Sequence, residues 1–173
     1  MSSIEILEEA FGRMPDAIRR AVSGLDTDQL VVRPTATATG SGKGNSVAWL
    51  IWHLTRVQDN HIADAAHLPE LWLNQGWEER FGLDLDSTDT GYGHISAQVE
   101  KVRPVSADLL VEYYDAVHSR TLEFIAGLGE VDLDRIVDAS WDPPVTLRVR
   151  LVSVVEDCMQ HAGQAAYVRG LLI

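Results

Sequence analysis

The sequence has one cysteine, Cys158, among 173 residues, and this scarcity excludes several kinds of site. A single cysteine cannot form an internal disulfide, and it cannot supply a C-x-x-C zinc or redox motif. We therefore expect a protein of a reducing compartment, the cytoplasm. Any metal ion must then be bound through histidines and carboxylates.

Basic residues are also scarce, with 14 Lys and Arg against 26 Asp and Glu, a formal net charge of −12. A surface of this sign repels nucleic acids and anionic membranes. No apolar run reaches transmembrane length without charges, and the first residues lack the basic and apolar segments of a secretory signal. We expect small molecules or other proteins as partners, with no nucleic acid and no membrane.

The apolar content of 46% is that of an ordinary globular protein, and we expect a single domain over residues 1–173. Apolar residues recur at three- and four-residue intervals in four long segments, which predicts four amphipathic helices. Pro15 lies inside the first pattern, so we expect a kink or a break between Gly12 and Pro15. The segments are 4–25, 45–67, 106–128 and a last one that begins within 145–151 and reaches 171.

The connections between these segments are long. We expect a short extra helix within 69–82, whose Trp72, Trp77 and Phe81 would be exposed as a dimer interface or as a lid over a pocket. Residues 34–44 and 84–94 are rich in Gly and turn residues and predict surface loops. The consecutive prolines in 138–146 predict a rigid crossing segment, and although 145–151 alternates like a strand, no partner strand is evident. The predicted fold is an all-α four-helix bundle with a short extra helix and long loops.

The last predicted helix carries Asp157 and His161, which are four residues apart and lie about one turn apart on nearly the same face. They flank a broad apolar arc, so both should face the edge of the core. For this pair alone, a solvated acid beside a partly buried histidine is the simpler interpretation. However, ligands commonly project inward from facing helices of a bundle, and His53 flanks the apolar arc of the second helix in the same way. The fold therefore favours a metal site.

Two stretches of the chain resemble a known family. His53 lies in a Trp-His-Leu context within Ser46–Leu54, and Asp157 precedes the segment His161-Ala162-Gly163-Gln164 by four residues. With the Trp-Asp-Pro-Pro-Val segment at 141–145, they resemble the DinB-like superfamily, and in particular its actinobacterial mycothiol-transferase branch. The similarity extends over nearly the whole chain.

The resemblance implies a DinB-like four-helix bundle that holds one divalent metal ion through three protein ligands, His53, Asp157 and His161. Many DinB relatives have a histidine at the position of Asp157. The related mycothiol-dependent maleylpyruvate isomerases use a carboxylate there.

Two imidazoles and a carboxylate are normal zinc ligands, and three protein ligands leave one position open, as in catalytic zinc sites. Zinc is the expected ion, with nickel, iron or manganese as alternatives that the ligands alone do not separate. Zinc coordination favours deprotonation of a bound thiol, so the resemblance implies an S-transferase that conjugates a low-molecular-weight thiol, mycothiol, to an electrophile. An activated water would instead give a metal-dependent hydrolase. A third hypothesis is a non-catalytic homodimer whose metal, or vestigial metal site, serves stability or sensing.

Several further residues have more than one open interpretation. Gln164 could contact substrate, orient a ligand or make an ordinary helix hydrogen bond. Arg56 could meet an anionic group of the cosubstrate or form an exposed pair with Asp59 or Asn60. Cys158 lies inside the apolar arc, where packing is the expected role and a reactive nucleophile the alternative. His61 is expected to be a hydrogen-bonded core residue, with a substrate role open, and we expect the remaining histidines on the surface, at His67, His94 and His118.

Overall fold

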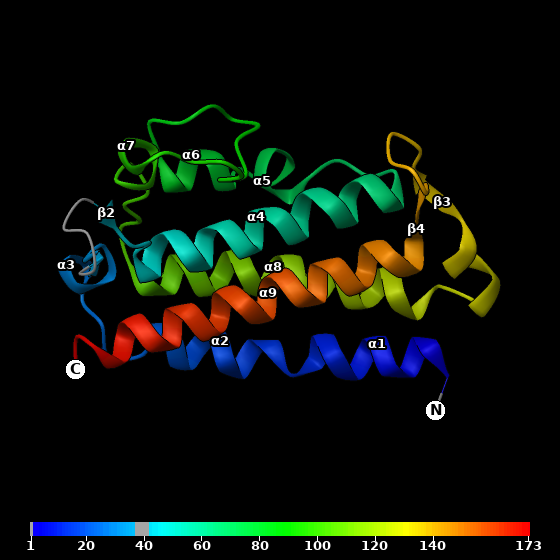
Figure 1. Cartoon of the computed structure of the whole chain (residues 1–173), viewed down its shortest axis with the longest axis horizontal. Helices are drawn as coiled ribbons and strands as arrows, with labels where there is room; N and C mark the ends of the chain where they lie inside the picture. Colours follow the sequence, from blue (N-terminus) through cyan, green and yellow to red (C-terminus); the bar gives the residue numbers. More distant parts are fainter. Residues whose placement is uncertain (1, 37–41) are drawn as a thin grey trace.

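The computed structural model describes residues 2–36 and 42–173, and the prediction that 34–44 is a surface loop falls partly outside them. Four long helical rods run side by side, so the predicted all-α bundle is confirmed (Figure 1). The first rod is made of two helices in line, and the others are single helices. These elements are α1 (Ser3–Gly12) and α2 (Met14–Val22), then α4 (Val47–Ala66), α8 (Ala107–Ala126) and α9 (Leu147–Gly170).

The break in the first rod lies where the sequence predicts it. Arg13 ends α1 and begins α2, and Pro15 occupies the first turn of α2, where a missing backbone N–H costs nothing. The other rods begin at side-chain caps. Ser46 accepts a hydrogen bond from the backbone of Trp49, and the helix continues to a left-handed residue, His67. The predicted bounds of this helix are confirmed.

The core lies between the four rods. It is closed by α4 against α9 and α8, and by α1 and α2 against the other faces of α8 and α9. Phe11, Met14 and Ile18 from the first rod are fully buried there, as are Leu50 and Leu151 from α4 and α9. In the chain direction α4 and α8 run parallel to each other, so the connection between them must cross the length of the bundle (Figure 1).

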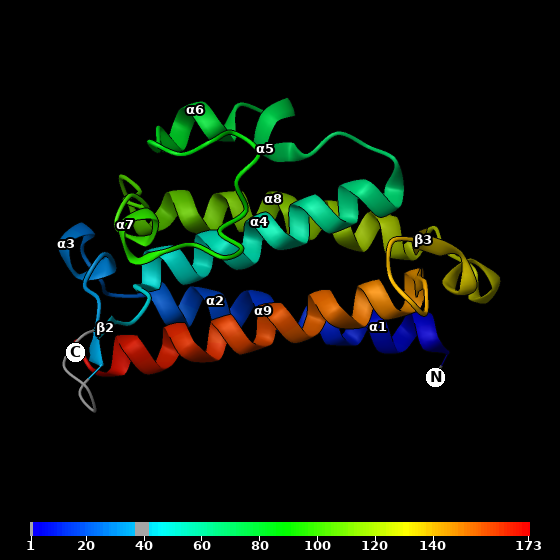
Figure 2. The ribbon, with the colours of Figure 1, turned by 45° about the horizontal axis from the view of Figure 1, so that its top comes forward.

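The long crossover between α4 and α8 forms a layer outside α4. Both views place its helices on the side of α4 that faces away from α1 and α2 (Figure 2). Trp72, Trp77 and Phe81 are buried in this layer against Tyr113 of α8, so the expectation of exposed aromatics is wrong. The layer buries the outer face of α4, whose inner face is already buried against α8 and α9. It contains α5 (Leu71–Asn74), α6 (Trp77–Phe81) and α7 (Ser96–Val99).

The remaining elements are short. A helix α3 (Thr27–Leu30) follows the first rod, and β1 (Thr35–Ala36) pairs antiparallel with β2 (Gly42–Lys43). The segment before α9 contains a 3₁₀ helix at Glu130–Asp134 and a hairpin in which β3 (Ile136–Asp138) pairs with β4 (Val145–Thr146). The alternation at 145–146 therefore does mark a strand with a partner. No helix in the described residues is long and apolar enough to cross a membrane.

Candidate functional site

The structure brings the three predicted ligands together. His53 on α4 lies against Asp157 and His161 on α9, and one potential ligand atom from each residue lies within 4.8 Å of the other two. His53 is buried, whereas the side chains of Asp157 and His161 are 29% and 18% exposed. The three side chains, called the ligand cluster below, thus lie at the edge of the core, as their positions on the apolar arcs predict.

The His53 ring is fixed on both sides. Its Nδ1 atom lies 2.5 Å from the backbone oxygen of Thr90, and its ring stacks on Trp49 with a centroid distance of 4.5 Å. A carbonyl oxygen can only accept, so Nδ1 carries the proton and Nε2 keeps its lone pair. Burial lowers the pKa of His53 and thereby favours the neutral imidazole that a metal requires.

His161 is oriented in the same way by a neighbour on its own helix. Its Nδ1 lies 2.9 Å from Oε1 of Gln164, which leaves Nε2 directed to the cluster, 3.5 Å from Oδ1 of Asp157. This contact agrees with the interpretation of Gln164 as a residue that orients a ligand. The hydrogen bond to Asp157 raises the pKa of His161, so a proton competes with a cation for Nε2 as the pH falls.

The carboxylate of Asp157 has an unused acceptor. Its Oδ2 atom is buried and has no hydrogen-bond partner in the described part of the chain. A buried carboxylate oxygen without a donor is costly, and a cation would satisfy it. The cluster therefore combines two oriented imidazoles with an unpaired carboxylate oxygen, and it is compatible with a divalent metal ion.

The carbonyl that orients His53 belongs to the crossover, in a loop that several side chains fix in place. Arg56 donates to the backbone oxygen of Asp89 at 3.1 Å, and the Asp89 carboxylate accepts from the Gly91 amide at 2.9 Å and from His94 Nε2 at 2.8 Å. The indole of Trp49 donates to His94 Nδ1 at 3.0 Å. These bonds hold the segment on both sides of Thr90 and set the direction of its carbonyl.

A pocket of about 430 Å³ lies beside the ligand cluster. It contains His53 and Asp157 and extends between α4 and α9 toward the β3–β4 hairpin. It is large enough for a small molecule. Its wall is made of residues from α4, the crossover loop, the hairpin and α9: His53, Val57, Asn60, His61, Thr90, Tyr92, Asp138, Trp141, Arg150, Ser153 and Asp157.

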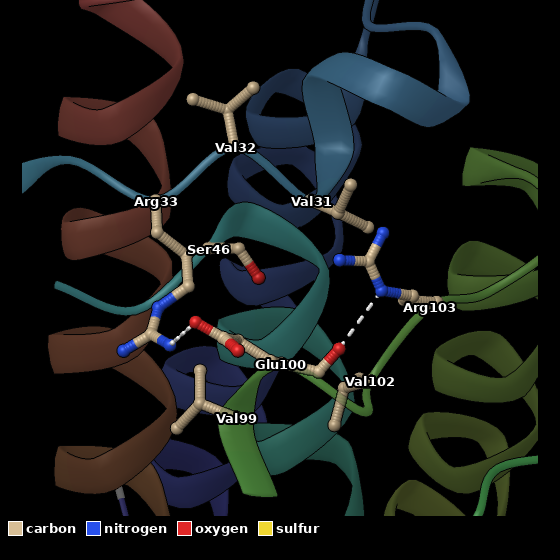
Figure 3. A pocket seen from close by; sticks show the side chains of 8 residues that line it. All are labelled: Val31, Val32, Arg33, Ser46, Val99, Glu100, Val102 and Arg103. Atoms are coloured by element: carbon tan, nitrogen blue, oxygen red, sulfur yellow. Dashed lines mark hydrogen bonds and ion pairs between the residues drawn. The ribbon is translucent and has the colours of Figure 1, made fainter. Parts of the chain in front are cut away.

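Another pocket, of about 330 Å³, lies where α4 begins (Figure 3). Arg33 pairs with the carboxylate of Glu100 at 3.2 Å, and Arg103 donates to the Glu100 backbone oxygen at 3.0 Å. The charged side chains of this pocket thus bind one another, and none of its lining residues belongs to the ligand cluster. We therefore place the candidate site in the pocket beside His53.

Comparison with known proteins agrees with this fold. The family model described as mycothiol-S-transferase matches residues 6–172, which include the three residues of the ligand cluster. The chain belongs to the mycothiol-S-transferase family. It is also similar to a crystal structure of a conserved protein from Enterococcus faecalis, with 32% identity, a TM-score of 0.87, and coverage of 98% of this chain and 96% of the other. No functionally curated protein matches it.

Two expectations about charged and polar side chains of this family member are wrong. Of the two interpretations of Arg56, the exposed pair is wrong, because the crossover covers the outer face of α4 and the side chain is fully buried; it lies 3.8 Å from Asp59 inside the protein. His94, expected on the surface, has a side chain that is only 2% exposed, between Trp49 and Asp89. Both residues support the loop that orients His53. The Trp residues on the outer face of α4 were the available signal that this face is covered.

The structure also decides between the interpretations of Cys158. The side chain is fully buried, with its sulfur 3.8 Å from the backbone oxygen of Leu54 and 3.5 Å from Oε1 of Gln58. Burial raises the pKa of the Cys158 thiol far above its ordinary value. Cys158 is therefore a packing residue and not a nucleophile.

Proposed function

We propose that the protein is a divalent-metal-dependent S-transferase that conjugates a low-molecular-weight thiol, mycothiol, to an electrophilic small molecule. The observation that carries the proposal is the ligand cluster, whose two histidines are oriented by Thr90 and Gln164 and whose members His53 and Asp157 line a 430 Å³ pocket. Membership of the mycothiol-S-transferase family supports a thiol as one substrate.

In this proposal His53, Asp157 and His161 hold the ion, with zinc as the expected metal and nickel, iron or manganese as alternatives. The ion, when bound, would lower the pKa of a coordinated thiol and so supply a nucleophile at neutral pH. Thr90 and Gln164 accept from the Nδ1 atoms of the two histidines and so would leave both Nε2 atoms free to hold an ion. In the conjugation the thiol gives its proton to solvent, its sulfur forms a bond to the electrophilic carbon, and the leaving group departs with the electron pair of the broken bond.

A direct test measures the consumption of an electrophile under four conditions, with and without thiol and with and without metal. We expect protein treated with a chelator to have lost turnover of 1-chloro-2,4-dinitrobenzene with mycothiol, and stoichiometric zinc to restore it. Absorbance of the conjugate gives the rate above the uncatalysed reaction. Loss of electrophile that needs zinc but not thiol would instead identify a hydrolase.

A matched control concerns the protein's own thiol. Because Cys158 is buried and protonated, the Cys158→Ala variant should keep its conjugation rate within about threefold, with a loss of stability of about 1 kcal/mol from the removed packing. Loss of turnover in a Cys158→Ala variant that still folds and binds zinc would make Cys158 the nucleophile and overturn the proposal.

A second prediction concerns the glycine next to Thr90. Gly91 has φ +90°, and a Cβ added there would lie 2.7 Å from Nδ1 of His53. We expect Gly91→Ala to displace the imidazole and to lower zinc affinity by about 10- to 100-fold, the usual effect of disturbing a residue that orients a metal ligand. Competition with a chromophoric chelator measures this affinity.

The control for that variant lies two residues further along the loop. Gly93 also has a left-handed conformation, with φ +72°, but no atom within 4 Å of the added Cβ. Gly93→Ala therefore introduces comparable backbone strain without the contact with His53. Equal losses of zinc affinity in both variants would show that loop strain, and not the position of His53, determines the result.

A further inference from the structure

The pocket beside the ligand cluster contains an arginine, Arg150, which forms an ion pair with Asp138 of the same wall. On α9, Arg150 precedes Asp157 by seven residues, so both lie on one face of the helix, separated by roughly 10 Å along its axis. Both line the pocket, and the side chain of Arg150 is only 14% exposed. A ligand that extends from the cluster along α9 therefore meets a guanidinium group.

The guanidinium of Arg150 is held in place by two neighbours, but not all of its N–H donors have an acceptor among the described residues. One Nη donates to Nδ1 of His61 at 3.0 Å, and the other donates to Oδ2 of Asp138 at 3.0 Å. Burial, together with the neighbouring Arg150, lowers the pKa of His61, which favours the neutral form that can accept. The Nε–H group is buried and has no acceptor among the described residues. Arginine has five N–H donors, so several remain for a ligand.

Part of the pocket wall is apolar and aromatic. Tyr92 from the crossover loop and Trp141 from the β3–β4 hairpin line the pocket, yet they are 92% and 66% exposed. Val57 lines it from α4. Large apolar rings left in solvent at the rim of a pocket are typical of a ligand-binding surface, because the body of a bound molecule covers them.

We propose that this pocket binds the electrophile, and that Arg150 binds a carboxylate at the end of that electrophile remote from the reacting carbon, with an apolar body between Tyr92 and Trp141. A guanidinium held by two neighbours matches a carboxylate in shape and charge. The acid group belongs to the electrophile because the cysteine carboxyl group of mycothiol is bound in an amide. This inference rests on the proposed function and adds a substrate class to it: carboxylic acids with an aromatic or unsaturated body.

The test compares two electrophiles that differ only in charge, 4-(bromomethyl)benzoate and 4-(bromomethyl)benzamide. In both, the thiol sulfur displaces bromide at the benzylic carbon. We expect the zinc-loaded protein with mycothiol to have the higher kcat/KM for the acid. Arg150→Gln should lower kcat/KM for the acid by about 10- to 100-fold, the effect of losing a charge-assisted hydrogen bond, and leave the amide within about threefold.

The matched control is Arg148→Gln, on the same helix. Arg148 forms an exposed ion pair with Asp134, with 49% and 75% of the two side chains exposed. The loss of Arg148 should therefore leave kcat/KM unchanged for both the acid and the amide. The amide rate also reports whether Arg150→Gln still folds and keeps its site. Equal loss for acid and amide in Arg150→Gln would mean that Arg150 only fixes the β3–β4 hairpin, and would overturn the proposal.

A binding measurement separates this proposal from the proposed function. The unreactive 4-methylbenzoate, titrated calorimetrically into zinc-loaded protein, should bind to the native chain and to Arg148→Gln but at least tenfold more weakly to Arg150→Gln. If binding depends on Arg150 but the protein conjugates no electrophile, the proposed transferase function is refuted and the carboxylate-binding role of Arg150 is retained. Equal binding to all three proteins would place the carboxylate on the metal and overturn the role of Arg150. The absence of binding to the native chain would overturn that role as well.

Discussion

Replacing His53 with alanine is expected to lower the rate of thiol conjugation at least about 100-fold and to remove most of the bound zinc. Loss of a residue that merely orients a metal ligand costs about 10- to 100-fold, and His53 is a proposed ligand itself. Its removal would leave two ligands, both on α9, and break the link between the two helices. Metal content per chain by mass spectrometry, together with kcat/KM, measures both effects.

The control for this variant is another histidine of α4. His67 is exposed and ends the helix in a left-handed conformation with φ 55°, which asparagine tolerates well. His67→Asn should therefore keep the full zinc content and the full rate. A His53→Ala protein that retained its activity would show that the ligand assignment is wrong. A protein that lost zinc and thermal stability, but had no conjugating activity to lose, would support the non-catalytic bundle.

Replacing Asp59 with alanine is expected to lower the free energy of unfolding by about 3–5 kcal/mol, the usual cost of breaking a buried ion pair. Its carboxylate is completely buried on α4. Oδ1 accepts from the Leu71 amide and from Arg120, and Oδ2 accepts from the Trp72 amide and from the Tyr113 hydroxyl. The carboxylate thus attaches the start of α5 to α4 and α8, and its loss strands these donors in the core.

Urea denaturation measures this effect as a shift in midpoint at a nearly constant slope. Asp64→Ala is the matched control, because Asp64 lies on the same helix but is exposed, and its loss should change the free energy of unfolding by less than about 0.5 kcal/mol. Asp59→Asn keeps the shape of the side chain, so its loss of unfolding free energy should lie between those of Asp59→Ala and Asp64→Ala. A free energy unchanged by Asp59→Ala would refute the role of this network in stability.

The helices and the ligand cluster could be predicted because they obey local rules. Periodic apolar residues define α4, α8 and α9, and the serines at 46 and 106 begin two of these helices as capping rules require. Asp157 and His161 are neighbours on any helix, and His53 flanks the apolar arc of the second helix in the same way. The resemblance then implies that the three form one ligand set. Their meeting in space needs only that α4 and α9 pack together, which a bundle with these apolar faces provides.

The support of the cluster could not be predicted, for two physical reasons. The acceptor for His53 is the backbone oxygen of Thr90, and a backbone group leaves no trace in the residue type. The sequence allows an exposed pair of Arg56 with Asp59, because charged residues are seldom buried without partners. Their partners, Glu70 and Arg120, lie in other segments of the chain, and only the folded crossover brings them together.

The short strands were missed because two- and three-residue pairings lack a repeating pattern. The hairpin at 136–146 consists of such pieces, yet it places Asp138 beside Arg150 and Trp141 at the rim of the pocket. The exposure of Trp72 was judged wrongly for a related reason. A short segment with only a moderate share of apolar residues can still be fully buried once it packs between two helices.

The loop around Thr90 has a consequence for attempts to transplant this site. A designer who copied only His53, Asp157 and His161 onto an idealised four-helix scaffold would obtain an imidazole free to rotate and to exchange tautomers, since nothing would replace the Thr90 carbonyl. The minimal portable unit is therefore two helices plus the crossover residues from Asp89 to His94, together with the Trp49 and Arg56 side chains that anchor them. In this protein a segment that resembles mere connecting chain is part of the architecture of the candidate site.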